Sequence, residues 1–242
     1  MSDHLHLESL DGSGAIREAA EAAGAFDSPL DRRSALRRGA TVAAGAALTT
    51  GFFATMLSPA EAAIVKGQHS KTNDVAILNY ALTLEYLESA FYAQAVANLK
   101  FTDPNVQFFA QTVAQHEADH VAALKKVLGS AAVASPTVNF GAAVTDQATF
   151  LATSKALEDT GVAAYAGQGT NILQKPVLVA ALSIHSVEAR HAAWVRLLLG
   201  GAVPQSTPLK SGNGAPAPAT FDDPLTEKQT LRIVTATNFI TG

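Results

Sequence analysis

The sequence predicts an all-α fold: a four-helix bundle of two antiparallel hairpins joined by a long crossover, with a short C-terminal helix added. Three observations predict it. Apolar residues recur at helical spacing in four long segments between residues 73 and 200. The links inside each pair of segments are about five residues long, whereas the link between the pairs is about sixteen, and short links make antiparallel neighbours. The composition, 48% hydrophobic but 7% aromatic, suits closely packed helices.

Residue types at the expected helix ends define the first hairpin. Its first helix is expected from about Asn73 to Asn98, with Asn73 or Asp74 as the N-cap. The second helix is expected to begin at Pro104, after Asp103 as its cap. It should end at Leu128, because the glycine that follows is a common C-terminal stop.

The second hairpin is delimited in the same way. Its first helix begins near Asp146 and ends around residues 167–169, and its second runs from about Pro176 to Gly200. The next segment is rich in Pro and Gly, which predicts a linker within residues 201–242 before a short helix. The apolar residues of that helix are expected to dock on the bundle or on a second subunit: Leu231, Ile233, Val234 and Phe239.

The N-terminal residues 1–63 have the pattern of an export signal. A basic segment with Arg32-Arg33 precedes a weakly apolar stretch from Gly39 to Leu57 and a small-residue cleavage pattern, Ala60-x-Ala62. The paired arginines and modest hydrophobicity predict a twin-arginine signal and a periplasmic or otherwise extracytoplasmic protein. Retention of this segment as a membrane anchor is the alternative. Residues 64–72 are then a linker before the bundle at 73–200, where no further membrane span is expected.

Composition limits the chemistry available to the chain. There are no cysteines, which excludes disulfides, thiolate metal sites and cysteine nucleophiles. Any metal must therefore be held by oxygen and nitrogen, ligands that suit iron, manganese or zinc. The formal charge of −4 is mild, and no basic patch indicates a nucleic-acid partner.

Two copies of a Glu-x-x-His motif carry the chemistry. One is Glu117-Ala-Asp-His120 on the second predicted helix, and the other is Glu188-Ala-Arg-His191 on the fourth. Residues three apart project from one face of a helix, so each pair can reach a single ion. One copy alone is a weak signal, but two copies, each on the second helix of a hairpin, are a strong one.

The first helix of each hairpin supplies a matching pair. Glu85 precedes Tyr92 by seven residues, and Glu158 precedes Tyr165 by the same interval, so each Glu and Tyr share one helical stripe. The order Glu, Tyr, Glu, His therefore occurs twice and predicts a pseudo-twofold axis through one site. The tyrosine hydroxyls are expected to hydrogen-bond neighbouring carboxylates, although simple packing is an alternative role.

This pattern resembles the ferritin-like di-iron carboxylate superfamily, in which two helices give one Glu each and two others give Glu-x-x-His. Within it, the chain resembles exported bacterial ferritin-like domain proteins, some of them labelled desiccation-related. The resemblance covers about half of the chain and implies two iron ions, with manganese as an alternative. It implies that Glu85 and His120 bind one ion, that Glu158 and His191 bind the other, and that Glu117 and Glu188 bridge them.

Several other polar residues compete for roles in this site. Glu88 is the alternative to Glu85 on the first helix. His116 should point about 100° away from Glu117 and lie at the surface or in an interface. His185 is expected to support a ligand or to pack in the core. Asp119 and Asp159 are expected to be solvated, and Trp194 to be a core residue.

The expected function is ferroxidase or peroxide-consuming redox activity that protects against oxidative or desiccation stress, with O2 or peroxide as co-substrate. Two ions about 3.5–4 Å apart can share the electrons of such a reaction. The alternatives are a manganese catalase-like enzyme, an enzyme with an organic substrate and a metal-stabilised structural protein without turnover. A homo-oligomer is compatible with the sequence.

Overall fold

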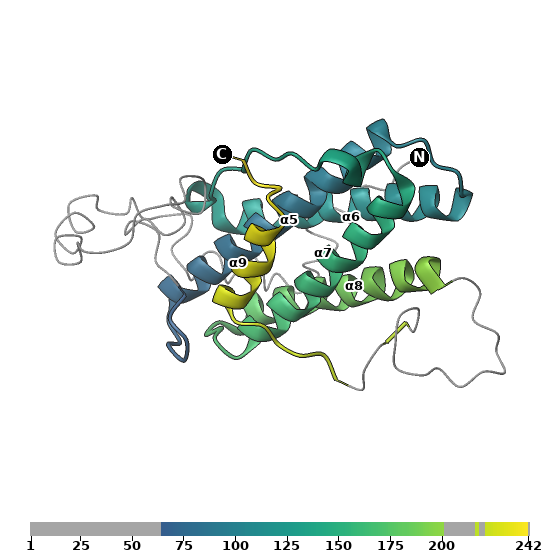
Figure 1. The fold of residues 1–242 in the computed structure, drawn as a ribbon. Helices are drawn as coiled ribbons and strands as arrows, with labels where there is room; N and C mark the ends of the chain where they lie inside the picture. The colour runs from purple at the N-terminus through teal and green to yellow at the C-terminus, as the bar shows by residue number, and fades with distance from the viewer. Residues whose placement is uncertain (1–63, 201–215, 218–220, 242) are drawn as a thin grey trace, which may run out of the picture.

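A computed structural model describes residues 64–200, 216–217 and 221–241 (Figure 1). The predicted export signal lies outside these residues. The four helices of the bundle are α5 (Lys71–Asn98), α6 (Pro104–Leu128), α7 (Gln147–Gly169) and α8 (Lys175–Gly200). A fifth, α9 (Glu227–Ala236), follows them. The prediction of an all-α bundle with a short C-terminal helix is confirmed.

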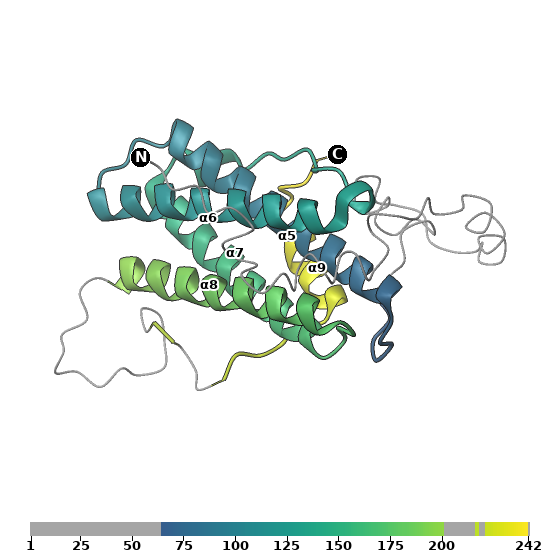
Figure 2. The ribbon, with the colours of Figure 1, turned by 180° about the vertical axis from the view of Figure 1, so that it is seen from behind.

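The bundle is built from two helix pairs. Helix α5 packs along α6, and α7 packs along α8, whereas contacts between the two pairs are sparser. Figure 2 shows the molecule from behind, with α6 and α8 as the two nearest helices. The long connection between α6 and α7 contains two short 3-10 turns, Gly129–Ala131 and Gly141–Val144.

The predicted cap of the first helix was wrong, while those of the second and third were right. The N-cap of α5 is Ser70, whose hydroxyl accepts a hydrogen bond from the Asn73 amide. Asn73 and Asp74 lie in the first turn, and both are buried. Asp103 caps α6 and Asp146 caps α7, each through its own carboxylate. The helix begins earlier because Asn73 and Asp74 are used for tertiary hydrogen bonds instead.

The C-terminal segment docks on the bundle. Helix α9 buries Val234, and Phe239 packs against the same core, whereas Ile233 is exposed and does not dock on the bundle. After the helix, Val138 and Ile240 form an isolated antiparallel bridge that joins the chain end to the crossover. Before the helix, the backbone of Leu225 passes so close to Gly167 that a β-carbon there would lie 1.8 Å from the Leu225 carbonyl oxygen.

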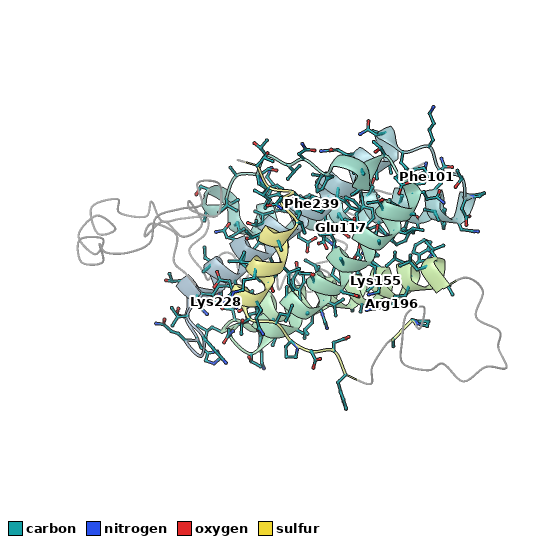
Figure 3. All side chains as sticks on the ribbon, in the orientation of Figure 1. Phe101, Glu117, Lys155, Arg196, Lys228 and Phe239 are labelled. Atoms are coloured by element: carbon teal, nitrogen blue, oxygen red, sulfur yellow. The ribbon has the colours of Figure 1, made fainter. Side chains whose placement is uncertain are left out.

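Two apolar clusters fill the two ends of the bundle. The first is centred on aromatic residues, including Phe91, Phe109 and Phe150, and the second on aliphatic residues, including Leu82 and Leu128. On α6 and α8, the buried residues Glu117, Glu188 and His191 lie between the residues of these two clusters. Figure 3 shows Glu117 in this interior layer. Of the helices described, none is long and apolar enough to span a membrane.

Asp74 ties the start of α5 to the α7–α8 connection. Its carboxylate is fully buried and accepts hydrogen bonds from the amides of Leu173 and Gln174 and from the Gln174 side chain. This contact sets how the second hairpin turns relative to the first helix, because it holds the short link between α7 and α8.

We expect Asp74→Ala to lower the free energy of unfolding by about 1–3 kcal/mol, because it leaves buried amide donors without an acceptor. Urea denaturation followed by circular dichroism measures the change. The exposed Asp222 provides the control, and Asp222→Ala should leave the midpoint unchanged. Equal midpoints for the two variants would contradict this role for Asp74.

Candidate metal centre

Six predicted site residues converge in the polar layer of the bundle. Their ligand atoms form two groups, within each of which all atoms lie within 4.8 Å of one another. Two carboxylates, Glu117 and Glu188, belong to both groups. The first group also contains Glu85 and His120, and the second Glu158 and His191. The structure thus brings together every predicted ligand, in the pairing that the resemblance implied.

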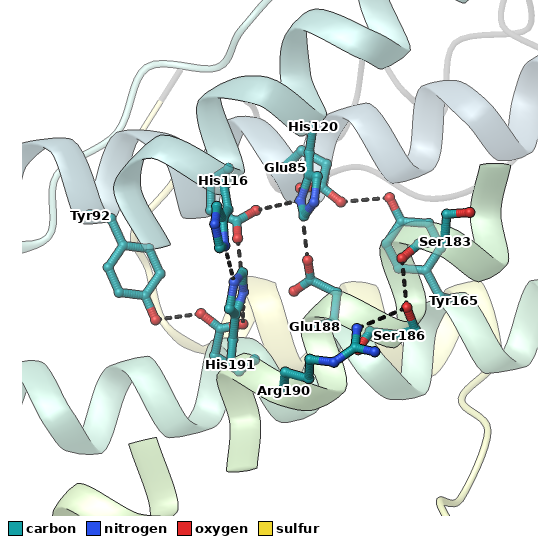
Figure 4. A network of polar contacts seen from close by, with 12 residues as sticks. Glu85, Tyr92, His116, His120, Tyr165, Ser183, Ser186, Glu188, Arg190 and His191 are labelled. Carbon is teal, nitrogen blue, oxygen red and sulfur yellow. Dashed lines mark hydrogen bonds and ion pairs between the residues drawn. The ribbon is translucent and has the colours of Figure 1, made fainter. Parts of the chain in front are cut away.

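Each element delivers its side chain through local helical geometry. The motifs on α6 and α8 place Glu and His one turn apart on an inward face. In the first group, His120 Nδ1 lies 3.2 Å from Glu85 Oε2, 3.1 Å from Glu117 Oε2 and 3.2 Å from Glu188 Oε1 (Figure 4). Three carboxylates from three helices therefore meet around one imidazole nitrogen.

The second group has the geometry of a cation site. His191 Nδ1 lies 3.1 Å from Glu117 Oε1 and 3.3 Å from Glu158 Oε2. Within the described part of the chain, these three atoms and both oxygens of Glu188 are buried without a hydrogen-bond partner. Buried polar atoms normally have such partners. Lone-pair donors that converge without hydrogen bonding one another fit a divalent metal ion bound between them.

The two tyrosines cross between the hairpins. Tyr92 on α5 donates a short hydrogen bond to Oε1 of Glu158 on α7. Reciprocally, Tyr165 on α7 donates to Oε1 of Glu85 on α5, at 2.5 Å. Each tyrosine thus orients a carboxylate from the opposite hairpin, and the two contacts are related by the pseudo-twofold axis that the sequence predicted.

Without a metal, protons balance the buried charge. Burial and neighbouring carboxylates hold the pKa of Glu188 well above its ordinary value, and burial together with Glu85 raises the pKa of Glu117 to about 7. Burial disfavours a charged His191, but Glu117 and Glu158 raise its pKa to about 10. Against the effect of burial, the charge of His120 lowers the pKa of Glu85. The buried carboxylates therefore favour the binding of cations, whether protons or metal ions.

A fifth buried glutamate in the described chain, Glu88, was not expected alongside Glu85. The sequence offered the two as alternatives, but both are buried, and it is Glu85 that joins the ligand group. A β-carbon on Gly161 of α7 would lie 3.2 Å from Glu188 Oε2 and 3.4 Å from Glu88 Oε1. The glycine therefore leaves room for two carboxyl groups. Burial and the four ligand carboxylates raise the pKa of Glu88 well above its ordinary value.

Helix geometry suggested that His116 points away from the site, but its ring contacts His191, a member of the second ligand group. His116 Nδ1 lies 2.9 Å from His191 Nε2, and the planes of the two rings differ by only 19°. His116 is half-buried, so it does lie near the surface as predicted, but the prediction missed its contact with His191 because it considered only the geometry of α6 and not α8, which packs against that side. His185, by contrast, belongs to neither ligand group, and its Nδ1 is buried without a partner in the described chain.

The remaining polar candidates have structural roles. Asp159 is not simply solvated, because it forms ion pairs with Lys155 on its own helix and with Arg196 on α8. Asp119 accepts a hydrogen bond from Gln115 one turn earlier. Trp194 is partly buried and packs edge-on against Phe109 in the aromatic cluster.

Comparison with known proteins agrees with this geometry. The family model described as a ferritin-like domain matches residues 73–201, which contain all six converging Glu and His side chains. No curated protein matches the chain.

The pKa shifts predict how the stability of the metal-free protein depends on pH. The folded state retains a proton on Glu117 up to about pH 7 and on His191 up to about pH 10. The unfolded chain releases these protons near 4.5 and 6.5. Since the folded state binds more protons across this range, its stability falls as pH rises from about 4.5 to about 10.

We expect the melting temperature of chelator-treated protein to decrease steadily from about pH 5 to about pH 9 by this linkage. Circular dichroism melting curves measure it. In Glu117→Gln, one of the titrating groups is removed, so the decrease below about pH 7 should be shallower. A melting temperature that rises over this interval would show that the buried groups do not carry these protons.

Proposed function

Because the chain belongs to the ferritin-like domain family, we propose that its bundle binds two divalent metal ions, iron in the first place, and uses them in redox chemistry with O2 or peroxide. A dinuclear iron centre supplies electrons to such oxidants when it is loaded. The protein's own residues bind the ions, orient the carboxylates and keep the centre in a dry interior. Manganese fits the same oxygen and nitrogen donors.

The observation that carries this proposal is the pair of ligand groups that share Glu117 and Glu188. Four buried carboxylates bring a charge of −4, and two divalent ions neutralise it. Isolated buried charge is unfavourable, so an interior layer of this composition is stabilised by cations. The two shared carboxylates favour two ions over one, because each offers an oxygen to either group.

The tyrosine contacts favour a reactive centre over a closed structural one. Each of them engages Oε1 of a terminal carboxylate, Glu158 or Glu85, which leaves Oε2 to face the ligand group. Each group would then offer its ion one oxygen or nitrogen from each of four side chains. Iron and manganese often take six ligands, so four such donors would leave room for an oxidant, as a catalytic site requires.

The biological role we propose is removal of ferrous iron or peroxide under oxidative or desiccation stress. We further propose that this takes place outside the cytoplasm, which the twin-arginine pattern near Arg32-Arg33 supports. Export in the folded state suits a protein whose metal is selected before it leaves the cell.

Elemental analysis of the purified protein should find two metal ions per chain, and Glu117→Ala should abolish their pairing because it removes a shared ligand. The loaded variant should also melt at a lower temperature than loaded wild type. Glu227→Ala, on α9 away from the ligand groups, is the control. Unchanged metal content in Glu117→Ala would disprove the ligand assignment.

Addition of ferrous iron in air should then produce a ferric-oxo absorption band in wild type. Two bound metals without such a band would support the metal-stabilised structural protein instead of the redox enzyme.

The tyrosine-to-phenylalanine variants test whether open positions matter. Tyr92→Phe and Tyr165→Phe free Oε1 of Glu158 and Glu85, respectively, so each carboxylate can chelate its ion with both oxygens. We expect both variants to keep two metals but to oxidise ferrous iron at least several-fold more slowly, as stopped-flow absorbance would measure. Tyr86→Phe is the control, because its hydroxyl donates to the Val133 carbonyl and not to a carboxylate of the ligand groups. Wild-type rates in both site variants would refute this reading of the tyrosines.

A further inference from the structure

His116 stands one residue before a shared carboxylate and reaches across from α6 to α8. Its Nδ1 is 2.9 Å from Nε2 of His191, with ring centroids 5.2 Å apart and an interplanar angle of 19°. The His191 ring is almost wholly buried, while His116 is only half-buried. His116 therefore lies on the outer side of a ligand ring, between it and the surface of the bundle.

The two nitrogens of His191 have different neighbours. Nδ1 faces Glu117 and Glu158 within the ligand group, and Nε2 faces His116. A metal ion binds a neutral imidazole through its unprotonated nitrogen, so Nδ1 as the ligand atom requires the proton on Nε2. That proton needs an acceptor, and Nδ1 of a neutral His116 is placed to accept it.

We propose that His116 is a positioning residue, whose hydrogen bond from His191 fixes the tautomer and ring plane of that ligand and strengthens binding of the ion in the His191 group. The inference rests on the proposed dinuclear centre. Partners of this kind hold a ligand ring in the correct orientation, and their loss typically weakens metal affinity about 10–100-fold.

The two metal positions are unequal for this reason. The residue that corresponds to His116 in the second motif is Val187, which also precedes a shared glutamate but can neither donate nor accept a hydrogen bond through its side chain. The pseudo-twofold symmetry of the ligands is thus broken one residue outside them. The His191 position should consequently retain its ion more tightly than the His120 position does.

Two substitutions separate the hydrogen bond from the packing of the His116 ring beside His191. His116→Phe keeps an aromatic ring against His191 but removes the acceptor. His116→Asn removes the ring, yet its side-chain oxygen can take the place of Nδ1. Val187→Ala is the matched control at the pseudo-symmetric position. Melting curves of the metal-free variants establish that each is folded.

The first readout is titration with Co2+, whose visible spectrum reports each ion as it binds. We expect His116→Phe to bind one of the two ions about 10–100-fold more weakly and the other unchanged. His116→Asn and Val187→Ala should stay within about threefold of wild type at both positions, well inside that range. The second readout is long-range proton–nitrogen NMR of the zinc-loaded protein, which should show His191 protonated at Nε2 in wild type and in His116→Asn.

Two results would overturn the role of His116 while leaving the dinuclear centre intact. One is two-ion binding by His116→Phe with wild-type affinities. The other is weaker binding in both His116 variants, which would assign the effect to packing of the ring. Failure of wild type itself to bind a pair of ions would instead overturn the proposed function, and this inference with it.

Discussion

The structure depends on the burial of carboxylates in the middle of a helical bundle. Glu85, Glu117, Glu158 and Glu188 are fully buried, and so much like charge cannot remain uncompensated in an apolar interior. Positive charge must enter the layer, as protons on the histidines and carboxyls or as metal ions. The aromatic and aliphatic clusters at the two ends of the bundle are what make the layer dry. Stability and function are therefore coupled through one requirement, because the packing that excludes water is also the packing that makes cation binding favourable.

The arrangement of the helices also depends on compensating the charge of the buried carboxylates. Each hairpin supplies half of the ligands, but neither hairpin can complete a ligand group alone, because the shared carboxylates and the tyrosine contacts cross between hairpins. A bound cation would therefore hold the two halves together where direct contact between them is sparse. Asp74 and the docked C-terminal segment add ties of their own at the periphery. A β-carbon at Gly167 would collide with the backbone of Leu225, and one at Gly161 would crowd the carboxylate of Glu188.

The surroundings of the ligands make the centre asymmetric even though the ligands themselves are symmetric. His116 supports one imidazole, Glu88 adds a fifth carboxyl group near Glu188, and neither has a counterpart in the other half. Residues just outside a ligand set govern its orientation and basicity. Differences in affinity or reactivity between the two metal positions would therefore arise from these outer residues.

The sequence by itself determined the helices and the ligand set, because both depend on local spacing. Apolar periodicity and the two Glu-x-x-His copies specify which residues share a helical face. Asp103 and Asp146 cap the starts of α6 and α7, and Gly129 caps the end of α6, so each acts within a few residues of its own position. Only the tertiary structure decided the rest. Asp74 is not the cap because the α7–α8 connection, some hundred residues later, uses its carboxylate, and the Asn73 side chain bonds instead to the Val65 amide and the Asn171 carbonyl. Glu88 is buried because Gly161 makes room for it, and His116 meets His191 because α8 approaches that side of α6. These contacts join residues far apart in the chain, and no local periodicity encodes which helix lies opposite a given side chain.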